Sequence, residues 1–83
     1  MTDLRDLAAR VMALTGPDNS LDVMCEVALH LSQGDWSIRA NSAGTKVIYT
    51  HKSGHSETHW AEDWTSPERR ERTAAALLAR SET

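Results

Sequence analysis

The segment that decides the fold is His59-Trp60-Ala61-Glu62-Asp63-Trp64-Thr65-Ser66-Pro67-Glu68. We interpret it as the end of a strand, a short acidic loop and the start of a helix. The segment holds two of the three tryptophans of a chain that has no Phe, so its large side chains must contribute to a core built mostly from aliphatic residues. We predict that Trp60 is the last inward-facing residue of a sheet and that Trp64 closes the core directly before the helix.

The helix that follows this loop has a marked start. Thr65 and, three positions later, Glu68 match a capping box, in which the two side chains satisfy backbone N–H groups of the first turn. Pro67 suits the first turn as well. An apolar stripe then predicts a helix that runs to about Arg80, formed by Thr73, Ala74, Leu77 and Leu78.

Two further helices are predicted in the N-terminal half, over residues 3–15 and 20–33. In both, apolar residues recur at three- and four-residue spacing, which places them on one face. Gly16-Pro17 ends the first helix, and one of the polar residues 18–20 can cap the second. The short connection between them favours an antiparallel pair.

The middle of the chain alternates polar and apolar residues, which is a strand pattern, over residues 36–40, 45–51 and 55–60. We assume three-residue hairpin loops between these strands. One sheet face would then pack on the helices with Trp36, Ile38, Ala40, Ile48, Thr58 and Trp60. The other face would carry Arg39, Val47, Tyr49, His51, His55, Glu57 and His59. The predicted fold class is α+β, with two N-terminal helices, a three-stranded antiparallel sheet and a C-terminal helix (ααβββα).

Length and composition fit one small domain that covers residues 1–83. A chain of this size buries a small core, so self-association into a homodimer is a reasonable expectation. The single cysteine, Cys25, excludes an internal disulfide framework and a multi-cysteine zinc site. Its apolar neighbours indicate a buried side chain.

Targeting signals and charge narrow the function further. The N-terminus has no signal-peptide pattern, and no stretch is long and apolar enough to span a membrane, so we expect a cytoplasmic protein without membrane contact. The net charge of -3 argues against direct nucleic-acid binding. No phosphate-binding Gly-rich loop, nucleophile elbow or carboxylate pair in an apolar pocket indicates an enzyme, and no pattern indicates a cofactor.

The only cluster with ligand chemistry consists of His51, His55, Glu57 and His59. Alternate strand residues lie about 7 Å apart, so this set could converge on Zn²⁺ or another transition ion. The spacing matches no standard metal signature, so a solvated polar face is the favoured interpretation. Together with Arg39 and Tyr49, which are typical interface anchors, the same face could instead bind a partner protein.

A second candidate surface is acidic. Asp18, Asp22 and Glu26 recur at four-residue spacing and therefore line one face of the second helix. The favoured interpretation is a solvated face with a capping contribution. The alternative is an acidic strip that meets a basic groove of another protein, to which Glu62 and Asp63 could add.

With these residues placed, the two ends of the chain resemble small phage and prophage proteins that carry the phage ABA-sandwich domain. The resemblance rests on three helix and turn motifs: Leu4-Arg5-Asp6-Leu7-Ala8-Ala9-Arg10, then Leu14-Thr15-Gly16-Pro17-Asp18 followed by Leu21-Asp22, and Ala74-Ala75-Ala76-Leu77-Leu78-Ala79-Arg80. In the middle, the family's Tyr-Thr-Ala-Ser strand is absent and a sheet with Trp and His replaces it. The family implies a phage origin and supplies no catalytic residues.

Small acidic phage proteins without catalytic signatures are similar in type to anti-CRISPR proteins. This resemblance implies a non-enzymatic inhibitor in the host cytoplasm, which binds a type I CRISPR effector (surveillance) complex and blocks its DNA binding. Two alternatives stay open. One is a phage accessory or assembly module that self-associates through Val47 and Tyr49, and the other is a His-based metal-binding module.

Overall fold

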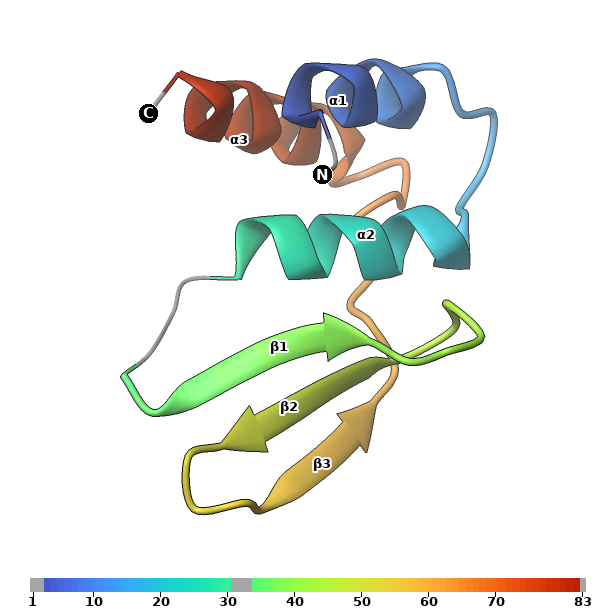
Figure 1. Cartoon of the computed structure of the whole chain (residues 1–83). Coiled ribbons are helices and arrows are strands. Elements are labelled where there is room, and N and C mark those ends of the chain that lie inside the picture. The colour runs from blue at the N-terminus through green and yellow to red at the C-terminus, as the bar shows by residue number, and fades with distance from the viewer. Residues whose placement is uncertain (1–2, 31–33, 83) are drawn as a thin grey trace.

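The computed structural model describes residues 3–30 and 34–82. Its elements are α1 (Leu4–Met12), α2 (Asn19–Leu29), β1 (Trp36–Ala40), β2 (Val47–His51), β3 (Ser56–His59) and α3 (Arg70–Ser81). They form three layers, with α1 and α3 side by side, α2 beneath them and the sheet beneath α2 (Figure 1). The segment after β3 passes α2 and rejoins the upper layer as α3, so it ties the layers together. The predicted ααβββα fold is confirmed.

The core lies between the three helices. Leu7 and Val11 of α1 meet Leu77 of α3 and Cys25 of α2, and all four side chains are fully buried. Trp64, which precedes α3, is half-buried and packs against the same cluster. The helical spacing predicted these buried positions correctly. Leu78, which also belongs to the predicted apolar stripe of the last helix, is 45% exposed.

The sheet is antiparallel in the order β1-β2-β3, with β2 in the centre. Tyr49 on β2 lies opposite Ile38 on β1 and opposite Glu57 on β3. The β2–β3 hairpin turns through residues 52–54, and its closing bond joins His51 N–H to the His55 carbonyl over 2.7 Å. The three-residue loop predicted for this hairpin is confirmed.

The β1–β2 hairpin differs from the prediction by one residue. Its loop has four residues, because Asn41 N–H donates to the Lys46 carbonyl over 3.0 Å and extends the ladder. The Asn41 side chain holds this loop: its Oδ1 accepts the N–H groups of Thr45 and Lys46. Gly44 takes the positive φ of +69° that the turn requires. A one-residue shift of register moves a whole strand to the opposite face.

The two sheet faces therefore have a different composition from the one expected. Trp36, Ile38 and Ala40 join Val47 and Tyr49 on the face toward α2, where Val47 is fully buried. The face away from α2 is formed by Ser37, Arg39, Ile48, Thr50, Ser56 and Thr58. The predicted solvent face of β2 and β3 is thus the one toward the helices, and Arg39 lies on the opposite face from Tyr49.

The capping box predicted at the start of the last helix does not form. α3 begins at Arg70, and residue 69 at its N-cap position makes no side-chain capping bond. Thr65 Oγ1, the expected cap, bonds instead to Asp22 of α2. The residues between form a turn, in which Ser66 accepts the N–H groups of Arg69 and Arg70 through its carbonyl oxygen.

The first two helices are shorter than expected, and one tryptophan lies outside the core. α1 ends at Met12 and α2 at Leu29, and the predicted last turn of α2 over residues 31–33 lies outside the described residues. Trp60 is 66% exposed, so the prediction that it ends the inward face is wrong. β3 stops at His59, and the chain then leaves the sheet.

Candidate functional site

The segment after β3 is held by two buried carboxylates of α2. Asp22 is 5% exposed, and its Oδ1 accepts two bonds of 2.7 Å, from Thr65 N–H and from the Thr65 hydroxyl. That hydroxyl oxygen in turn accepts the Asp18 N–H over 2.8 Å. Because a buried carboxylate is stable only when donors surround it, Asp22 serves the fold and is closed to a partner.

Glu26 fills the same structural role one turn later. It is 6% exposed, and its Oε1 accepts Glu62 N–H over 2.8 Å and Trp64 Nε1–H over 3.1 Å. Its Oε2 accepts the Tyr49 hydroxyl over 2.6 Å. Burial and the bond to Glu26 raise the pKa of Tyr49 above its ordinary value, so the phenol stays a donor. One carboxylate thus links α2, the central strand and residues 60–69 between β3 and α3, which we call the crossing segment.

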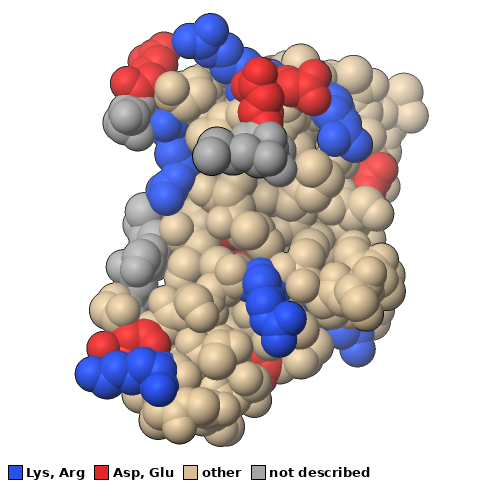
Figure 2. Space-filling model, in the orientation of Figure 1, with Lys and Arg blue, Asp and Glu red and all other residues tan. Residues whose placement is uncertain are grey.

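These contacts overturn the prediction of an exposed acidic strip on α2. Asp22 and Glu26 are buried, and half-buried Asp18 caps α2 by accepting Leu21 N–H over 3.0 Å. On the face shown in Figure 2, acidic side chains lie mainly around the upper helical layer and at the lower left corner. Near the middle of that face a basic side chain stands out among mostly uncharged residues. Of the predicted acids, Glu62 and Asp63 are exposed.

An open pocket of about 480 Å³ lies between the end of α2 and the face of the sheet toward it. The described residues that line it are Glu26, His30, Trp36, Tyr49, Glu57, His59, Trp60 and Glu62. They combine aromatic rings with three carboxylates, and none of them is Lys or Arg. We call this set the aromatic–acidic pocket.

Edge-on ring contacts build the floor of this region. The Tyr49 ring lies between the rings of His30 and His59, with centroid distances of 5.6 Å and 5.8 Å. The Trp36 ring contacts His51 at 5.0 Å and His55 at 6.2 Å in the same geometry. Such contacts stabilise ring positions beyond the effect of burial alone, so the floor is preorganised.

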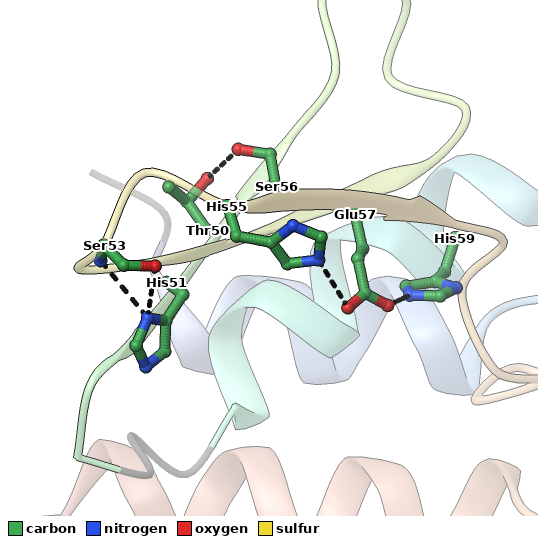
Figure 3. Close-up of polar contacts among 7 residues, drawn as sticks. All are labelled: Thr50, His51, Ser53, His55, Ser56, Glu57 and His59. Carbon is green, nitrogen blue, oxygen red and sulfur yellow. Dashed lines mark hydrogen bonds and ion pairs between the residues drawn. The ribbon is translucent and has the colours of Figure 1, made fainter.

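Glu57 lies between two histidines of its own strand segment. Its Oε2 is 3.0 Å from His55 Nε2 and its Oε1 is 3.1 Å from His59 Nε2 (Figure 3). These hydrogen bonds lower the pKa of Glu57, so the carboxylate is an anion at neutral pH. His51 makes different contacts, with Nδ1 2.8 Å from the Ser53 hydroxyl.

The histidines do not form a metal centre in this arrangement. His55 and His59 both direct Nε2 at the Glu57 carboxylate rather than at a common point. Within residues 3–30 and 34–82, no group of three or more His, Cys, Asp or Glu side chains is placed to hold a metal ion. The geometry therefore favours an anionic site flanked by imidazoles over a metal-binding module.

Two cations of the chain lie on tryptophan rings near the pocket. Lys46 Nζ is 4.6 Å from the centroid of the exposed Trp60 ring. The Arg69 guanidinium carbon is likewise 4.6 Å from the Trp64 ring. Arg69 Nη1 also lies 3.4 Å from Glu62 Oε1. The rim thus already engages cations by stacking and by charge.

The structure brings together some of the predicted site residues and separates others. The pocket contains Glu26, Tyr49, Glu57, His59 and Glu62, with His51 and His55 beside it. Outside its lining lie Asp18, Asp22, Arg39 and Asp63. Sequence reasoning missed His30, Trp36 and Trp60 as site residues. His30 directly follows α2, and Trp60 directly follows β3. Trp36 begins β1 and reaches the face of Tyr49 only in the observed register.

The single cysteine of the chain is not exposed to this site. The Cys25 thiol is fully buried, and burial together with the nearby Asp22 charge raises its pKa to about 12. A thiol in that environment is protonated and unreactive.

None of the helices in the described part of the chain is long and apolar enough to cross a membrane. Comparison with known proteins finds no matching family model, no matching characterised protein and no matching solved structure.

Proposed function

We propose that this chain is a non-catalytic protein-binding module and that its docking surface is the aromatic–acidic pocket. The observation that supports this most is the pocket's composition: aromatic rings and carboxylates line an open depression on a preorganised floor. Aromatic side chains supply large contact area at low entropic cost and are typical anchors of interfaces. On α2, Cys25, Asp22 and Glu26 are buried, and the two carboxylates are hydrogen-bonded within the fold.

The narrower form of the proposal is an anti-CRISPR protein. The chain would bind a host type I surveillance complex, in the cytoplasm of the infected cell, and block its DNA binding. The resemblance of its terminal motifs to phage proteins supports this form, as does the absence of Lys and Arg among the described pocket residues. A surface that holds DNA is basic, so an acidic pocket is complementary to it.

Self-association through Val47 and Tyr49 is not part of the proposal. Val47 is fully buried, and the Tyr49 hydroxyl bonds to Glu26 of α2. Neither side chain is free to form the sheet-to-sheet contact that this alternative requires.

The test is DNA capture by a purified type I surveillance complex, followed by electrophoretic mobility shift. The wild-type chain should reduce capture, and Glu57→Lys should restore it because a cation would then face a basic surface. Glu71→Lys is the matched control, because it makes the same charge change at an exposed position of α3. Undiminished DNA capture at saturating wild-type protein would contradict the narrower proposal.

A further inference from the structure

We propose that the aromatic–acidic pocket binds an arginine side chain presented by the partner protein. This inference rests on the proposed function, because it specifies which partner group the same surface receives. Three features support it: the charge of the pocket, the aromatic rings that line it and the capacity of the Glu57 carboxylate to accept further hydrogen bonds.

The charge of the pocket selects a cation. Glu26, Glu57 and Glu62 contribute carboxylates, and the lining that the structure describes contains neither Lys nor Arg. Glu26 is buried and already accepts three donors, and Glu62 already contacts Arg69. Glu57 is the exposed carboxylate with capacity for an additional donor. Among the described residues each of its oxygens has one hydrogen-bond partner, His55 or His59, and a carboxylate oxygen accepts two hydrogen bonds.

The aromatic rings of the pocket favour a cation that stacks on them. The indole of Trp36 and the phenol of Tyr49 line the pocket, and Trp60 lies at its rim. A cation over such a ring gains electrostatic attraction from the ring's quadrupole. Lys46 on Trp60 is an internal precedent at this rim, because its ammonium already occupies this geometry.

The combination of a carboxylate and stacking rings favours arginine over lysine. A guanidinium is planar and weakly hydrated, so it can stack on an indole while its N–H groups bond to a carboxylate. An ammonium is compact and strongly hydrated, so its contact with the aromatic rings is less favourable. The pocket has a volume of about 480 Å³ and is open to solvent, so a side chain of a partner can enter it.

The experiment is an NMR titration of the full chain, at pH 8, with Nα-acetyl-arginine methylamide as the probe. The two matched probes are the uncharged citrulline analogue and the lysine analogue. We expect the arginine probe to shift the indole N–H resonances of Trp36 and Trp60, and the citrulline probe to leave them unchanged. Equal shifts from both, or stronger binding of the lysine analogue, would overturn the proposal.

Two variants test the carboxylate assignment. Glu57→Gln should weaken binding of the arginine probe about threefold, as expected for the loss of one exposed charge pair. Glu71→Gln, which removes a charge outside the pocket, should not change it. Both sites are exposed, so both variants should stay folded, and dispersed amide spectra would verify this. Equal affinities of the two variants would overturn the role of Glu57.

The outcomes separate this inference from the function it rests on. If the arginine probe binds as expected while the surveillance complex captures DNA normally, the pocket assignment holds and the anti-CRISPR proposal fails. If inhibition is strong while the probe causes no indole shift, the pocket assignment fails and the protein-binding function holds.

Discussion

Glu26 Oε2 accepts a 2.6 Å hydrogen bond from the Tyr49 hydroxyl, and this bond joins α2 to the central strand. Because Glu26 Oε1 also accepts Glu62 N–H and Trp64 Nε1–H, the same carboxylate sets the path of the segment after β3. The floor of the pocket and the upper helical layer thus depend on one buried side chain.

Replacing Glu26 by Ala should destabilise the protein by about 3 kcal/mol, because it leaves the three donors without their acceptor. Tyr49→Phe removes a single donor from the same carboxylate and should cost about 1.5 kcal/mol. Urea denaturation followed by tryptophan fluorescence measures both. A Glu26→Ala protein as stable as the wild type would contradict the structural role of this carboxylate.

Thr65 provides a second test of the buried anchors. Thr65→Val keeps the shape of the side chain but removes the hydroxyl that donates to Asp22 and accepts Asp18 N–H. We expect a loss of about 2 kcal/mol of unfolding free energy. Thr65→Ser keeps the hydroxyl and should cost less. Equal stabilities of the Thr65→Val and Thr65→Ser proteins would contradict this role of the hydroxyl.

The order of elements could be predicted from sequence because it depends on local patterns. The three- and four-residue spacing of Leu7 and Val11 marks α1, and the alternation around Ile38 marks β1. The start of α3 could not be predicted in the same way. Thr65 and Asp22 are separated by 43 residues, and nothing in the sequence near Thr65 indicates that its hydroxyl donates a hydrogen bond to a distant carboxylate.

The pocket depends on the register of β1 against β2, which could not be predicted from the sequence of the loop between them. The Asn41 side chain accepts two backbone N–H groups and adds one residue to the first hairpin. That residue brings Trp36 to the same face as Tyr49 and sends Arg39 to the other. The second hairpin follows a three-residue loop, and so the grouping of His55, Glu57 and His59 could be predicted.

The Cys25 thiol should be inert in the folded protein. Its pKa is raised from 9.0 to about 12, so a thiol-specific reagent such as Ellman's reagent should react at pH 8 only after unfolding. The raised pKa also has a consequence for stability. Between pH 9 and 12 the unfolded thiol loses its proton while the folded one keeps it, so the Cys25 contribution to stability falls as the pH rises.

Cys25→Ala is the control for this pH dependence, because it removes the titrating group. The fall in unfolding free energy above pH 9 should be smaller in this variant than in the wild type. Rapid labelling of native wild-type protein at pH 8 would contradict the burial of the thiol.

Truncation of the two tryptophans of the crossing segment should destabilise the protein to different extents. Trp60 is 66% exposed, so Trp60→Ala should change the unfolding free energy by less than about 1 kcal/mol, the size of its contact with Lys46. Trp64 packs on the helical core and donates to Glu26. Trp64→Ala should therefore cost about 2–3 kcal/mol.

The same pair separates stability from binding. Because Trp60 lies at the rim of the pocket, Trp60→Ala should weaken the arginine probe while the protein stays folded. Chemical denaturation and the probe titration, run on both variants, measure the two effects. Equal losses of stability from the two substitutions would indicate that Trp60 is part of the core. Trp60 would then not be available to bind a partner's side chain at the pocket.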